Sequence, residues 1–148
     1  MPTFVIGRGL PGSGKTTRAR AVVAQDPDSW VRLNRDDFRV MGHGRRTGRR
    51  SQEDQVTVVQ HAGIRAALTA GYNVVVDDVN LNPAVFQELV RIGVDCGARV
   101  DVGTLDLRGV PLGVCHANNQ LRFGTDQFVP PEEIERMHAT YLAKDTDA

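Results

Sequence analysis

Short apolar runs alternate with amphipathic stretches along the 148 residues of the chain. Residues 3–7 form a brief apolar run that ends in glycine, and the continuous valines within residues 72–77 suit a strand buried on both faces. Residues 13–25, 51–71 and 83–97 instead space their apolar side chains as helices do. Strands that alternate with helices predict a parallel α/β sheet with right-handed crossovers.

The rest of the chain continues this alternation. We expect further strands at 30–34 and 99–107, helices at 111–121 and 130–142, and loops at 39–50 and 122–129. The complete pattern predicts a small parallel sheet of about four to five strands flanked by helices. From the length we expect one domain over residues 1–148 and not a two-domain enzyme.

A glycine-rich segment between the first strand and the first helix carries the clearest chemistry. Gly9-Leu-Pro-Gly-Ser-Gly-Lys-Thr16 fits the phosphate-binding motif G-x-x-x-x-G-K-[ST] at every fixed position. Its glycines let backbone N–H groups turn toward an anion, and the helix that follows adds its positive dipole end. We expect Lys15 to reach the β- and γ-phosphates and Thr16 to hold Mg²⁺. The residues predicted to bind ATP or another nucleoside triphosphate are Gly9, Pro11, Gly12, Ser13, Gly14, Lys15, Thr16 and Thr17.

This P-loop motif is shared by molecular switches, motors and kinases. The guanine-binding pattern Asn-Lys-x-Asp does not occur in the sequence, and the chain is short for a complete ATPase motor core. A short kinase fits best, because it needs only a minimal sheet, an acceptor pocket and a lid over the triphosphate. We expect the P-loop NTPase fold with a helical lid at about residues 111–130.

Three polar sites follow predicted elements, and each has two interpretations. Asp36 and Asp37 follow the second strand, where a carboxylate can deprotonate an acceptor hydroxyl, but the pair also suits a helix N-terminus. Asp77 ends an apolar strand as an Mg²⁺-ordering carboxylate does, although the spacing alone favours an Asp- and Asn-rich turn that needs no ligand. Arg122 lies on a polar segment, where it either closes over the γ-phosphate or faces solvent.

Charge is unevenly distributed although 18 basic residues balance 18 acidic ones. Residues 32–50 hold seven arginines against two aspartates, which favours an anionic partner. Cys96 and Cys115 are too few for a disulfide framework, and no signal peptide or membrane-length apolar run is evident. We therefore expect a cytoplasmic protein without a membrane partner, in a bacterium or a phage-infected host.

Four motifs together resemble those of the polynucleotide 5′-hydroxyl kinases, in particular the kinase domain of phage polynucleotide kinase. They are Gly9–Thr17, Asn34-Arg-Asp-Asp-Phe-Arg39, Asp78-Val-Asn-Leu-Asn-Pro83, and Asn119-Gln-Leu-Arg122 followed by Val129-Pro130. The resemblance runs from near residue 3 to about residue 142. It implies an Mg²⁺-dependent enzyme of nucleic acid repair that transfers the γ-phosphate of ATP or another NTP to the 5′-OH end of DNA or RNA.

The resemblance also implies a role for individual residues. Lys15 and Arg122 would act on the donor phosphates, and Asp36 would be the general base on the 5′-hydroxyl. Arg39 would contact the 3′-phosphate of the terminal nucleotide and would be held by Asp78. The candidate metal residues are Thr16 directly, and Asp36 or Asp77 through water. The arginines expected along the path of the strand, unless they only face solvent, are Arg45, Arg46, Arg49 and Arg50.

Two other functions remain open at this stage. One is a small-molecule kinase that acts on a sugar, nucleoside or antibiotic hydroxyl, although the basic segment 32–50 argues against a neutral acceptor. The other is a nucleotide-binding module without phosphotransfer. The sequence is also compatible with a homo-oligomer.

Overall fold

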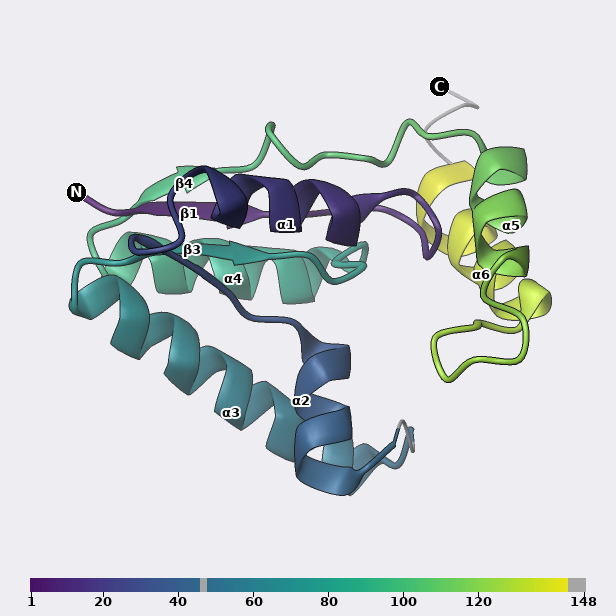
Figure 1. Cartoon of the computed structure of the whole chain (residues 1–148), viewed down its shortest axis with the longest axis horizontal. Helices are drawn as coiled ribbons and strands as arrows, with labels where there is room; N and C mark the ends of the chain where they lie inside the picture. Colours follow the sequence, from purple (N-terminus) through teal and green to yellow (C-terminus); the bar gives the residue numbers. More distant parts are fainter. Residues whose placement is uncertain (46–47, 144–148) are drawn as a thin grey trace.

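Four parallel strands form the centre of the molecule in the order β2-β3-β1-β4 (Figure 1). The computed structural model describes residues 1–45 and 48–143. Phe4 of β1 lies opposite Val74 of β3 and, on the other side, opposite Val100 of β4. The predicted parallel sheet is therefore confirmed. The strands are β1 (Thr3–Ile6), β2 (Trp30–Arg32), β3 (Asn73–Val76) and β4 (Arg99–Asp101).

Helices cover both faces of the sheet because the strand side chains alternate in direction. Phe4 and Ile6 pack against α3 and α4 on one face, whereas Val5 packs against α1 on the other. This alternation explains why the strands are apolar at nearly every position. The helices are α1 (Lys15–Gln25), α2 (Arg35–His43), α3 (Arg50–Thr69), α4 (Pro83–Asp95), α5 (Leu112–Gln120), α6 (Pro131–Met137) and the π-helical turn η1 (His138–Leu142).

A separate group of helices lies beyond the carboxyl ends of the strands. Figure 1 shows α5 and α6 at this end, with α2 at the same end on the other side. Leu10, Leu81, Cys115 and Ile134 form a small core that fixes the α5–α6 group to the loops after β1 and β3. Ligands of open α/β sheets bind at the carboxyl ends of the strands, so this arrangement frames the site. Within the described residues, no helix is both long and apolar enough to cross a membrane.

The predicted loop at 39–50 is wrong over its first part, because α2 continues to His43. The Gly- and Arg-rich composition suggested a loop. In the structure, Arg39 pairs with Asp36 one turn earlier and with Glu53 on α3, so its charge is compensated on the helix. The helix ends at Gly44, whose left-handed φ of 77° and N–H bond to the Val40 carbonyl close the last turn.

The predicted strand at 99–107 is also shorter than expected and ends at Asp101. The Asp101 carboxylate accepts hydrogen bonds from the N–H groups of Gly103 and Thr104, both at 3.0 Å, and so starts a turn. Leu105 and Leu107 are buried again after this turn. Their burial accounts for the apolar pattern that resembled a continued strand.

Candidate active site

The glycine-rich segment forms an open phosphate cradle between β1 and α1. Gly12 and Gly14 have φ values of 83° and 99°, a left-handed conformation that favours glycine. Gly14 is also the N-cap of α1, which has no side-chain cap and no acidic residue in its first turn. The first N–H groups of a helix lack intrahelical partners, so this helix end is available to an anion.

Lys15 lies inside this cradle and is almost fully buried. Its Nζ donates to the carbonyls of Gly9 at 2.7 Å and Leu10 at 2.8 Å, and to Ser13 Oγ at 3.3 Å. Burial lowers the pKa of Lys15 to about 8, against the attraction of Asp77 and Asp78, which raises it. A triphosphate would supply the negative charge that this buried ammonium group favours.

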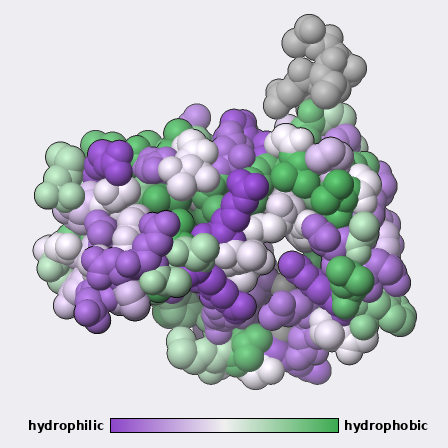
Figure 2. Space-filling model, turned by 45° about the horizontal axis from the view of Figure 1, so that its top comes forward, coloured by the Kyte–Doolittle hydropathy of each residue, from purple (hydrophilic) through white to green (hydrophobic). Residues whose placement is uncertain are grey.

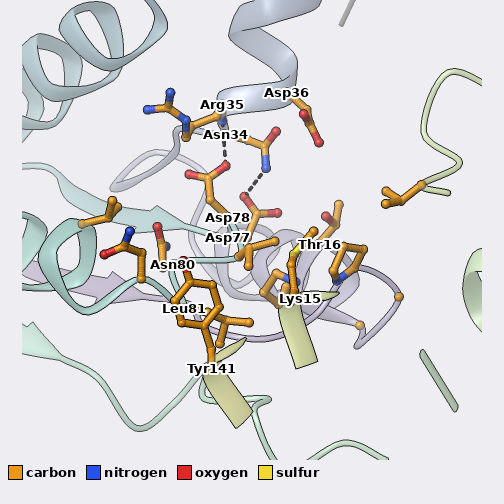
Figure 3. A pocket seen from close by; sticks show the side chains of 18 of the residues that line it. Lys15, Thr16, Asn34, Arg35, Asp36, Asp77, Asp78, Asn80, Leu81 and Tyr141 are labelled. Atoms are coloured by element: carbon orange, nitrogen blue, oxygen red, sulfur yellow. Dashed lines mark hydrogen bonds between the residues drawn. The ribbon is translucent and has the colours of Figure 1, made fainter. Parts of the chain in front are cut away.

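Asp36 lies in the first turn of α2 and lines the same pocket as Lys15 and Thr16. Figure 3 shows its carboxylate reaching from the start of α2 toward the side of the pocket formed by Thr16. The Asp36 side chain is 37% exposed and pairs with Arg39. The helix cap itself is Asn34, whose side chain accepts from Asp37 N at 3.1 Å, so Asp36 is not needed as the cap.

Asp78 is partly buried just after β3 and holds the start of α2. Its two oxygens accept from Arg35 N at 2.8 Å and from Gln60 Nε2 at 2.6 Å. Burial raises the pKa of Asp78 to about 6, although both hydrogen bonds favour the charged form. Asp78 thereby links the end of β3 to α2 and, through Gln60, to α3.

Arg39 is held differently from the expectation. The prediction that Asp78 holds Arg39 is wrong, because Asp78 bonds instead to Arg35 N and Gln60. Arg39 lines the pocket, but its guanidinium pairs with Asp36 and with Glu53, whose Oε2 lies 2.6 Å from Arg39 Nε. The hydrogen bond from Arg39 lowers the pKa of Glu53 below its usual value.

Asp77, the residue before Asp78, has a structural role. Its Oδ2 accepts from Arg32 Nε and its Oδ1 from Asn34 Nδ2, both at 2.9 Å. The side chain is fully buried. Asp77 therefore anchors the end of β2 and the cap of α2 to β3, and its geometry offers no argument for holding Mg²⁺.

Arg122, in the turn after α5, lines the same pocket. Arg122 and Lys15 thus face one cavity, and the positive charge of Arg122 adds to burial in lowering the pKa of Lys15. An anion between them would be attracted by both. The interpretation of Arg122 as a residue that only faces solvent is therefore disfavoured.

These residues line one pocket of about 400 Å³. The space-filling view is hollowed at this place, and hydrophilic residues gather around the opening (Figure 2). Gly9 and Ser13 do not line the pocket; instead, both accept hydrogen bonds from Lys15. Thr17 is exposed and does not line the pocket either. The predicted site residues that line it are Pro11, Gly12, Gly14, Lys15, Thr16, Asp36, Arg39, Asp77, Asp78 and Arg122.

Sequence reasoning missed the polar residues that support the pocket from behind. Gln60 is buried on α3, in the same helical row as Val56, Ile64 and Leu68. A polar residue within an apolar row is the signal that could have identified it. Glu53, one turn before Thr57 on the same helix, carried no comparable signal because acidic residues are common on exposed helix faces.

The sheet order, the cradle after β1 and the ligand pocket at the strand ends define the P-loop NTPase fold, in the form found in P-loop kinases. A family model described as an AAA domain, AAA_33, matches residues 4–143, and the chain belongs to this family. The predicted fold and the resemblance to P-loop kinases are thereby confirmed.

Solved structures with the same fold include one from "the Pnkp1/Rnl/Hen1 RNA repair complex", which is 30% identical with a TM-score of 0.83. The match covers 99% of this chain and 45% of the chain in that complex, so this chain spans less than half the length of the matched protein. Kti12 of Chaetomium thermophilum in complex with ADP-AlF3 is 21% identical, with a TM-score of 0.65 over 95% of this chain and 80% of that one. A gluconokinase from Sinorhizobium meliloti 1021 is 20% identical, with a TM-score of 0.56 over 94% and 74%. The last two matches concern the fold alone.

Proposed function

We propose that this P-loop kinase transfers the γ-phosphate of ATP, or another nucleoside triphosphate, to the 5′-OH end of a DNA or RNA strand. The observation that carries the proposal is that Asp36, Lys15 and Arg122 line one pocket. A carboxylate at the acceptor and cations at the donor phosphates are the groups that phosphoryl transfer requires.

Each residue would contribute through charge and position. The cradle and Lys15 hold the donor phosphates, and Arg122 neutralises charge that develops on the transferred group. Asp36 orients the 5′-hydroxyl and takes its proton as the oxygen–phosphorus bond forms, while the bond from the γ-phosphorus to its bridging oxygen breaks. The nucleoside diphosphate leaves with the electron pair of that bond, so no covalent enzyme intermediate is needed.

Thr16 is the residue proposed to hold Mg²⁺ together with the donor phosphates. Its position suits this role, because it lines the pocket in the first turn of α1, next to the uncapped helix end. The ion supplies charge neutralisation on the phosphate oxygens.

The acceptor side supports a nucleic acid end over a neutral small molecule. Arg39 lines the pocket beside Asp36 and is proposed to contact a phosphate of the terminal nucleotide. Arg45, Arg49 and Arg50 are exposed near the ends of α2 and α3, where they offer charge to a polymer, whereas Arg46 lies outside the described residues. The 30% identity to a chain of an RNA repair complex favours the same substrate class.

The test is the rate of phosphate transfer to a 5′-OH oligonucleotide by Asp36→Asn, with Asp37→Asn as the matched control. Asp37 is the adjacent acid, but it does not line the pocket and pairs with Arg32 instead. Loss of the general base is expected to lower kcat by about 10²–10⁴ while ATP affinity changes little. Asp37→Asn is expected to keep kcat within about threefold of the unmodified enzyme.

An equal effect of both substitutions would reject Asp36 as the base. ATP binding without phosphate transfer to any oligonucleotide, in the unmodified protein, would favour the non-catalytic nucleotide-binding module.

A further inference from the structure

Helix α5 carries two adjacent asparagines that contact different parts of the pocket. Asn118 Nδ2 donates to the carbonyl of Gly12 in the phosphate cradle at 2.8 Å. Asn119 bonds instead to Val129, at the far end of the segment that follows α5. One short helix is thereby bonded to both the cradle and the segment that carries Arg122.

Asn119 closes the segment 120–128 into a loop through two hydrogen bonds. Its Nδ2 donates to the Val129 carbonyl at 2.6 Å, and its Oδ1 accepts from Val129 N at 3.0 Å. The Asn119 side chain is buried, so water does not replace these bonds easily. Arg122 lies in the first turn of this loop, where its N–H bonds back to the Asn119 carbonyl at 2.9 Å. Residue 119 therefore contacts both ends of the loop, and its side chain holds the end at Val129.

The contact between α5 and the cradle is also close at the backbone. A Cβ atom added at Gly12 would lie only 2.3 Å from the Cys115 carbonyl oxygen, so only glycine fits against this turn of α5. The bond from Asn118 to the Gly12 carbonyl lies one turn further along the helix. The helix and the cradle are thus in direct contact at two successive turns of α5.

We infer that α5 sets the position of Arg122 relative to the phosphate cradle, with Asn119 as the positioning residue for Arg122 and Asn118 as the positioning residue for the cradle. The inference rests on the proposed function, in which Arg122 acts on the donor phosphates. Neither asparagine touches the reacting atoms. Asn119 acts through the loop, and Asn118 acts through the backbone of Gly12.

The two asparagines are tested against each other by steady-state kinetics of transfer to a 5′-OH oligonucleotide. Asn119→Ala is expected to lower kcat about 10- to 100-fold, with KM for ATP within about threefold, because Arg122 is misplaced while the cradle is intact. Asn118→Ala is expected to raise KM for ATP about 5- to 20-fold with a smaller change in kcat. Gln120→Ala, an exposed amide on the same helix, is the control and is expected to match the unmodified enzyme.

A double substitution separates positioning from general damage to the fold. Arg122→Ala combined with Asn119→Ala is expected to be no slower than Arg122→Ala alone, because the asparagine acts only through the arginine. Asn119→Asp, which keeps the size and the acceptor for Val129 N, covers the case in which Asn119→Ala does not fold. It is expected to lower kcat about 3- to 10-fold, and this loss is also expected to vanish when Arg122 is alanine.

Amide hydrogen exchange at Val129, in the protein without nucleotide, gives a readout independent of activity. Exchange is expected to be about tenfold or more faster in Asn119→Ala than in Gln120→Ala. If the losses of kcat in Arg122→Ala and Asn119→Ala multiply in the double variant, or if Asn119→Ala leaves kcat unchanged, the inference is overturned. Either result would leave the proposed function standing. Unchanged kcat in Arg122→Ala would instead reject the role of Arg122 in the proposed function, and the inference would fall with it.

Discussion

Two ionisable residues at the pocket, Lys15 and Asp78, have pKa values that are shifted in the direction that favours the neutral form. Burial lowers the pKa of Lys15 to about 8 and raises that of Asp78 to about 6. Burial therefore destabilises the charged forms of both side chains in the folded protein, and unfolding would return these side chains to water. A site prepared in this way is less stable without ligand, and a bound triphosphate would compensate the charge of Lys15.

Lys15→Met is expected to stabilise the nucleotide-free protein while it removes ATP binding. Lys15 gives up its proton near pH 8 when folded and near pH 10.5 when unfolded, so the unfolded state binds more protons between these values. The free energy of unfolding of the unmodified protein therefore rises with pH over this interval, and the full cost of burial applies below pH 8. At pH 7 the substitution is expected to raise the free energy of unfolding by about 1–3 kcal/mol.

Denaturant unfolding at a series of pH values measures this effect. The difference between Lys15→Met and the unmodified protein is expected to shrink from pH 8 to pH 10.5. Arg20→Met, at an exposed position of the same helix, is the control and is expected to change the free energy of unfolding by no more than about 0.5 kcal/mol. A Lys15→Met protein that is less stable at pH 7 would contradict this account of the buried ammonium group.

At the scale of elements, α2 carries Asp36 but is not fixed by a core of its own. All of α2 is described, and none of its residues is fully buried. Hydrogen bonds hold its start instead: Arg35 N donates to Asp78, and the Asn34 side chain donates to Asp77. The position of the proposed base therefore depends on hydrogen bonds at the ends of β2 and β3.

Gln60→Leu is expected to loosen this anchor. The Gln60 amide donates to Asp78 and to the Leu33 carbonyl, and an apolar side chain would leave both partly buried acceptors with one hydrogen bond fewer. We expect a loss of about 1–3 kcal/mol in the free energy of unfolding, together with a lower kcat for phosphate transfer. Gln55→Leu, on the exposed side of the same helix, is the control. Equal unfolding midpoints for the two variants would show that Gln60 does not anchor α2.

The sequence was sufficient to predict the elements whose cause is local. The glycines of the cradle and the valines of β3 specify backbone conformation and burial directly, and both were predicted correctly. The partners of Arg39 were not predicted, because Glu53 lies on α3 and contacts Arg39 only once α2 and α3 pack together. The end of β4 was missed because one side chain, Asp101, starts a turn within an apolar pattern.

At the scale of the whole molecule, the pocket lies where two groups of elements meet. α2 and the segment after β3 supply the carboxylates Asp36, Asp77 and Asp78, the turn after α5 supplies Arg122, and the cradle supplies Lys15. Figure 1 shows the arrangement of these elements at one end of the sheet. The volume of about 400 Å³ is enclosed by parts of the chain that lie far apart in sequence. The same geometry serves any P-loop kinase, so the acceptor is the property that distinguishes this protein from relatives with the same fold.

Comparison of acceptors in one labelled-ATP assay tests the central proposal most directly. Short 5′-OH DNA and RNA oligonucleotides are compared with gluconate, free nucleosides and an aminoglycoside at matched concentrations. The account predicts label at the 5′ end of an oligonucleotide, with kcat/KM at least about 10²-fold higher than for any small alcohol. Label on a small alcohol at the higher kcat/KM, with oligonucleotides unmodified, would contradict it.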